Sequence, residues 1–105
     1  MLSVYLSMID TQEDRDKFER LFHQYERCLK YTAQNILGDE HLAEDAVQET
    51  FIRIIGCLSK IDETEEHKTA GFLMTVVKNI AYDIKRKQSK NQPAASLEEM
   101  AEFNA

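Results

Sequence analysis

Apolar residues recur along the chain at intervals of three and four, the period of an α-helix that buries one face. The first run is short and consists of Leu2, Tyr5, Leu6 and Ile9. It predicts a short N-terminal helix within residues 1–10 that docks on the core. Thr11 follows as the expected N-cap of a second helix, because its hydroxyl can accept a hydrogen bond from the first turn.

The second run predicts a long helix from about Thr11 to Ile36. Its expected buried face is Phe18, Leu21, Phe22, Tyr25, Leu29, Ala33 and Ile36. Gly38 is expected to end this helix, because glycine readily takes the left-handed conformation past a helix terminus. Asp39 is the expected N-cap of a third helix. The predicted core positions of that helix are Val47, Phe51, Ile54 and Leu58.

Residues 60–69, KIDETEEHKT, show no hydrophobic period after Ile61 and predict a polar, mainly acidic loop. Thr69 is the expected N-cap of a last long helix. The apolar positions of that helix are Phe72, Leu73, Val76, Val77, Ile80 and Ile84. Further on, Ser96 and Glu99 form a capping box that predicts one more short helix.

We therefore expect an all-α fold, a compact bundle of three long helices with short N-terminal and C-terminal flanking helices. The composition agrees, because three Gly and one Pro in 105 residues leave little material for tight turns. A hydrophobic content of 43% with 30% charged residues is typical of a globular protein, and the length suffices for one core.

The sequence argues against membrane insertion, secretion and catalysis. No apolar run approaches the roughly 20 residues of a membrane span, and the N-terminus lacks a signal peptide's basic flank and cleavage site. We expect a cytoplasmic protein, in which Cys28 and Cys57 are small core residues rather than a disulfide. His23, His41 and His67 fall at no metal-ligand spacing, and no nucleophile–base pair is evident. We expect no enzyme, no metal site and no cofactor.

The net charge of −6 is divided unevenly along the chain. Residues 68–90 hold six basic residues against the single acid Asp83, a net +5, so that the remainder carries −11. Such asymmetry indicates two surfaces with different partners. A basic helix end that only complements its own macrodipole remains the alternative.

Two motifs resemble those of one known family. Residues 38–51, GDEHLAEDAVQETF, are similar to GDxxxAEDxVQExF, and residues 78–87, KNIAYDIKRK, are similar to RNxAxDxxRR. Over about residues 18–90 the chain resembles the second conserved region of extracytoplasmic-function (ECF) sigma factors, the promoter-recognising subunits of bacterial RNA polymerase. The resemblance implies a region 2 domain at residues 1–90, with a core bundle from residue 11, and the start of an interdomain linker at residues 91–105. It also leads us to expect that the family's C-terminal region 4 domain is absent.

The resemblance implies a polymerase-binding face on the helix that matches residues 43–55. In the family this helix docks on a coiled coil of the polymerase's largest subunit, its clamp helices. The residues assigned to this interface are Asp45, Gln48, Glu49 and Ile52. A polar stripe with one apolar neighbour can pair with basic residues of a partner helix. On the residues alone, a solvated helix face remains the alternative.

The resemblance also implies a DNA-binding face. The family captures a flipped base of the non-template strand of the minus-ten element with the loop before the last helix, here Ile61 to Thr69, and with that helix. Asn79 is expected to touch the base, because an amide both donates and accepts. Phe72 stands where many relatives have tryptophan and is expected either to wedge near the duplex fork or to lie wholly in the core. The basic residues expected along the strand are Lys68, Lys78, Lys85, Arg86 and Lys87.

The resemblance thus predicts a transcription-initiation domain that binds core RNA polymerase and recognises and helps melt the minus-ten element. A helical protein–protein adaptor without DNA binding stays open, and it would tolerate loss of Asn79. A dimeric helix-turn-helix regulator fits less well, because the ten-residue loop is not a short turn. The acidic residues 62–66, DETEE, are expected either to discourage non-specific DNA binding or to contact an anti-sigma factor.

Overall fold

The described part of the chain folds entirely into helices joined by short connections. The computed structural model describes residues 2–90, without the side chain of Lys90. Its elements are α1 (Leu2–Ser7), α2 (Gln12–Leu37), α3 (Glu40–Ile55), the short 3-10 helix η1 (Leu58–Lys60) and α4 (Glu66–Lys90). Within these residues no strand forms, so the predicted all-α fold is confirmed. The capping box at Ser96 and Glu99 lies outside the described residues.

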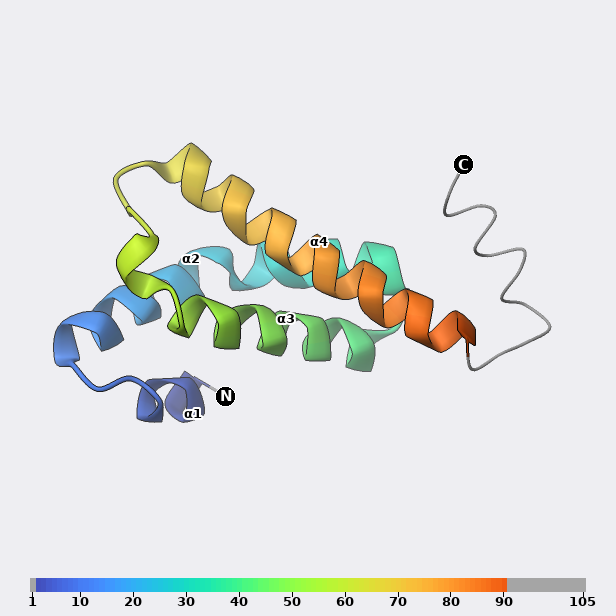
Figure 1. The fold of residues 1–105 in the computed structure, drawn as a ribbon, viewed down its shortest axis with the longest axis horizontal. Helices are drawn as coiled ribbons and strands as arrows, with labels where there is room; N and C mark the ends of the chain where they lie inside the picture. The colour runs from blue at the N-terminus through green and yellow to red at the C-terminus, as the bar shows by residue number, and fades with distance from the viewer. Residues whose placement is uncertain (1, 91–105) are drawn as a thin grey trace.

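The three long helices pack against one another, and α1 packs on α2 and α3 (Figure 1). α4 crosses the other two helices and brings the chain back from the η1 end of the bundle. The described residues include no helix long and apolar enough to cross a membrane.

Three predicted helix ends are confirmed in atomic detail, the two ends of α2 and the start of α3, whereas α3 ends at Ile55 and leaves the predicted core residue Leu58 in η1. The Thr11 hydroxyl accepts from the backbone N–H of Asp14 at 3.2 Å and caps α2. Gly38 ends α2 with φ 65°, and its N–H donates to the Gln34 carbonyl at 2.8 Å. The Asp39 carboxylate then accepts from the N–H of Leu42 at 3.1 Å and caps α3.

The core follows the predicted apolar faces with several differences, among them Val76 and Ile84 of α4, which are only partly buried. Phe22 and Ile36 are only partly buried, whereas Ala43, Ala46 and Thr50 of α3 are completely buried. Small residues allow α3 to approach its neighbours closely, and a periodicity count of large apolar residues does not detect them. The Thr50 hydroxyl donates to the Ala46 carbonyl at 2.7 Å, so its polar group is satisfied inside its own helix.

Three sequence-based interpretations are wrong, those of Thr69, of the polar segment and of Cys28. Thr69 is not an N-cap: α4 begins one turn earlier, at Glu66, and the Thr69 hydroxyl donates to the Asp62 carbonyl at 2.9 Å. The polar segment is shorter than predicted, because η1 and this early start of α4 take residues from both of its ends. Cys28 is exposed rather than core, since it lies on the outer face of α2. Cys57 is half-buried, and both thiols are free.

Candidate functional site

The face of α3 that points away from the core carries the four residues of the sequence-predicted polymerase stripe. Asp45 and Glu49 are exposed, Gln48 is half-buried, and Ile52 is 48% exposed despite being apolar. The opposite face of the same helix supplies buried residues to the core, among them Ala46, Val47, Phe51 and Ile54. The outward face therefore combines carboxylates with one accessible aliphatic side chain. We refer to Asp45, Gln48, Glu49 and Ile52 as the α3 stripe.

Glu49 makes an ion pair with Arg53 one turn later, with a distance of 3.2 Å between Arg53 Nη2 and Glu49 Oε1. Both side chains are about half exposed, so the pair adds little stability. It leaves the carboxylate accessible to a partner.

The outward face of α4 presents a mixed basic and aromatic row. Its members recur at intervals of three and four and so share one face: Lys68, Phe72, Thr75, Asn79, Tyr82 and Arg86. We call these six residues the α4 row. Phe72 is 44% exposed, so the interpretation that it lies wholly in the core is wrong. Tyr82 is 38% exposed and was not among the predicted DNA-binding residues, although its spacing from Asn79 placed it on this face.

The predicted basic residues surround this row. Lys78 and Lys87 are exposed, and Lys85 is half-buried. Asp83 bridges the C-terminal part of the helix, 3.4 Å from Arg86 Nη2 and 3.3 Å from Lys87 Nζ. The hydrogen bond from Lys87, together with the charges of Lys87 and Arg86, lowers the pKa of Asp83. Asp83 thus orients two of the predicted phosphate-binding side chains.

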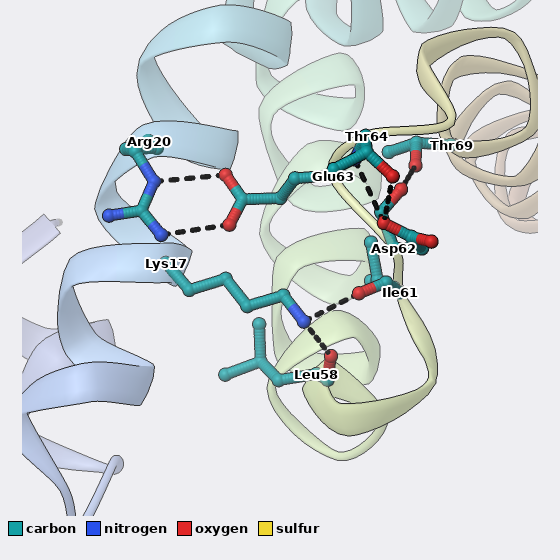
Figure 2. A network of polar contacts seen from close by, with 8 residues as sticks. All are labelled: Lys17, Arg20, Leu58, Ile61, Asp62, Glu63, Thr64 and Thr69. Atoms are coloured by element: carbon teal, nitrogen blue, oxygen red, sulfur yellow. Dashed lines mark hydrogen bonds and ion pairs between the residues drawn. The ribbon is translucent and has the colours of Figure 1, made fainter.

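The connection between η1 and α4 is fastened to α2 by two long side chains (Figure 2). Lys17 Nζ donates to the carbonyl oxygens of Leu58, at 2.7 Å, and Ile61, at 2.5 Å. Arg20 makes a two-pronged pair with Glu63: Nε lies 2.9 Å from Oε2, and Nη2 lies 2.8 Å from Oε1. These contacts join residues more than 40 positions apart, and they were not predicted from the sequence.

The same connection is also stabilised from within (Figure 2). The Asp62 carboxylate accepts from the N–H of Thr64 at 2.9 Å and from its hydroxyl at 2.6 Å. These bonds lower the pKa of Asp62, and the hydrogen bond from Arg20 lowers the pKa of Glu63. Glu65 pairs with Lys68 at 3.0 Å. Three of the four acids of the DETEE segment are therefore engaged within the protein.

A pocket of about 300 Å³ opens between η1, this connection and the first turns of α4. Its lining residues are Cys57, Lys60, Ile61, Asp62, Glu65, Lys68, Thr69 and Phe72. It has an apolar wall and charged groups of both signs. The structure brings the predicted residues Lys68 and Phe72 together here. Cys57 and Lys60 join them because η1 turns toward α4, which no local sequence signal indicated.

Asn79 does not line this pocket. It lies seven residues beyond Phe72 on the same face of α4, which corresponds to about 10 Å along the helix axis. The pocket and Asn79 are consequently two separate points along one row.

Comparison with known protein families gave one match. Residues 21–91, about two thirds of the chain, match the family model described as sigma-70 region 2. Comparison with curated proteins gave no match, and neither did comparison with solved structures.

Proposed function

Because the chain belongs to the sigma-70 region 2 family, we propose that it acts as an ECF-type region 2 domain with two separate working surfaces. The family assignment supports a sigma-factor role in promoter recognition and in binding RNA polymerase, without enzymatic activity. The finer proposal is that the α3 stripe docks on the polymerase, while the α4 row and the pocket before it recognise and help melt the minus-ten element. The single observation that carries it is the exposure of an acidic stripe and a basic, aromatic row on two different helices.

The matched region begins at residue 21 and leaves α1 outside it. We include α1 in the same domain, residues 1–90, because it packs on both α2 and α3 and Tyr5 is buried among core aromatic rings.

The α3 stripe suits a basic partner helix. Asp45 and Glu49 offer carboxylates at the surface, Gln48 adds an amide, and the exposed Ile52 gives an apolar contact. Charges arranged in this way favour fast, oriented association and exclude acidic partners. The clamp coiled coil of the polymerase's largest subunit is the partner we propose.

The α4 row suits an unpaired DNA strand. Phe72 and Tyr82 present aromatic surface on which bases can stack, while Lys78, Arg86 and Lys87 supply positive charge for phosphates. Asn79 lies between the two aromatic residues and can read a base edge as donor and acceptor. The pocket at Phe72 would accept a base displaced from the stack, at a cost of a few kcal/mol that the polymerase complex must offset.

A binding measurement with purified bacterial core RNA polymerase tests the docking proposal. Glu49→Lys is expected to weaken capture by at least about tenfold, because it replaces an attractive charge by a repulsive one at the centre of the α3 stripe. Glu19→Lys on α2 is the matched control, since it makes the same charge change at another exposed site. Circular dichroism checks that all three proteins are folded. Failure of the folded wild type to bind would contradict the proposed function and favour the adaptor alternative.

A further inference from the structure

A second pocket, of about 210 Å³, lies between α1, α2 and α3 at the edge of the α3 stripe. Its floor is apolar and consists of Tyr5, Phe22, Val47 and Phe51. The three rings form a packed group, with centroids 5.0 Å apart for Phe22 and Phe51 and 5.8 Å apart for Tyr5 and Phe51. Since one water occupies about 30 Å³ of liquid, the pocket has room for a side chain.

The rim of this pocket is polar and carries a net negative charge. Its members are Glu26, Lys30, Glu44 and Gln48. Lys30 already pairs with Glu44, with 3.3 Å between Nζ and Oε1. Glu26 has no ion-pair partner among residues 2–90. Burial raises the pKa of the Tyr5 phenol, and the charge of the nearby Glu26 carboxylate raises it further. The Glu26 carboxylate therefore lies without an ion-pair partner at the rim of an apolar pocket.

We propose that this pocket receives an arginine side chain from the polymerase coiled coil that docks on the α3 stripe. The inference rests on the proposed function and adds a specific contact to it. The aliphatic stem and guanidinium plane of arginine pack on aromatic rings, while its head pairs with a carboxylate. Glu26 supplies that carboxylate, and the side-chain oxygens of Tyr5 and Gln48 are further acceptors on the pocket wall.

The position of the pocket beside the α3 stripe and the negative charge of its rim both favour an arginine of the partner as the occupant. Gln48 belongs to both the α3 stripe and the pocket rim, so a helix lying along the stripe passes the pocket mouth. An apolar side chain would leave Glu26 unpaired beside a partner, and an acidic side chain would be repelled. Lysine fits less well than arginine, because it lacks the planar group that can stack on the partly exposed ring of Phe22. The pocket also makes α1 part of the docking surface, since Tyr5 forms one wall.

The test is a titration of the full chain against core RNA polymerase with Glu26→Lys and Glu26→Gln. We expect Glu26→Lys to weaken binding by about tenfold or more and Glu26→Gln by severalfold. Glu19→Lys, two turns earlier on the same helix, should stay within about twofold of wild type. Glu26 is only half-buried, and its side chain makes no hydrogen bond or ion pair within residues 2–90, so both variants should fold, as thermal unfolding can verify. Tyr5→Phe keeps the ring packing and should weaken binding slightly.

The outcomes separate this inference from the proposed function. If Glu49→Lys abolishes binding while Glu26→Lys behaves like Glu19→Lys, the arginine pocket is refuted and the docking proposal stands. If folded wild type does not bind polymerase, both fail. If sedimentation shows that the chain self-associates and that Glu26→Lys abolishes this, the pocket belongs to a second copy of the chain and the inference is overturned.

Discussion

At the scale of single residues, Gly38 and Gly71 show how backbone conformation decides whether adding a Cβ lowers or raises the stability of the protein. Gly38 has φ 65° at the end of α2, a conformation that L-residues with a Cβ rarely adopt. Gly71 lies exposed inside α4. A Cβ added at either position meets no atom within 4 Å, so the available space is the same and only the backbone differs.

The two substitutions are expected to have opposite effects on stability. Gly38→Ala should lower the free energy of unfolding by about 1 kcal/mol, because the left-handed conformation is unfavourable for a residue with a Cβ. Gly71→Ala should raise it by about 0.5–1 kcal/mol through helix propensity. Each change corresponds to several degrees in Tm by thermal unfolding. A stabilising Gly38→Ala would show that α2 ends differently in solution.

Single residues also explain the misassigned cysteine and threonine. Cys28 lies between Arg27 and the buried Leu29 in the sequence, and its place in the helical period of α2 turns it outward. Thr69 has the chemistry of an N-cap, but its hydroxyl bonds instead to a carbonyl seven residues earlier.

At the scale of elements, the connection between η1 and α4 is held in shape by α2. Lys17 holds the end of η1, and the pair between Arg20 and Glu63 holds the next turn. A loop fixed in this way presents a preformed pocket beside Phe72 rather than one that must be ordered on binding.

The pair between Arg20 and Glu63 predicts a pH dependence. Because the folded-state pKa of Glu63 lies below its ordinary value of 4.5, its stabilising effect is complete above that pH and is lost as the pH falls through the lowered value. The effect should be small, since Arg20 is largely exposed. Urea unfolding should show Glu63→Gln less stable than wild type at pH 7, with the difference shrinking as the pH falls below 4.5. In an Arg20→Gln background this dependence should be much weaker, and an unchanged dependence would exclude the pair as its cause.

At the scale of the whole molecule, the charge distribution indicates a protein that needs a partner to bind promoter DNA. The total charge is −6, while the segment containing the α4 row is basic. The acids on α2 and α3 repel duplex DNA, and a few phosphate contacts at physiological salt give only weak binding. Docking of the α3 stripe on the polymerase would neutralise part of that repulsion.

Fluorescence anisotropy with a labelled promoter can test this dependence. At ~150 mM salt the free chain should bind duplex with a Kd no tighter than about 100 µM, in the range of non-specific binding. Together with core polymerase it should bind a minus-ten element tightly. Asn79→Ala should weaken the latter complex by about tenfold or more, the effect of one base-edge contact, without altering polymerase capture. Tight, sequence-specific duplex binding by the free chain would contradict the argument.

The sequence by itself determined the helices, because their signals are local. Caps at Thr11 and Asp39, the glycine end at Gly38 and the period of large apolar residues all act within one or two turns. The resemblance to the family also rested on two short motifs that can be read directly from the sequence. Polymerase-binding and DNA-binding residues could be proposed on that basis, although their contacts remain predictions.

Only the tertiary structure decided which surfaces those helices create together. Lys17 meets carbonyls 41 and 44 residues away, and Arg20 meets Glu63 across 43 residues. The pocket beside Phe72 and the pocket above the rings of Tyr5, Phe22 and Phe51 each combine several elements. These long-range contacts are fixed by the simultaneous packing of all three long helices. The spacing of residues within a single helix does not determine that packing.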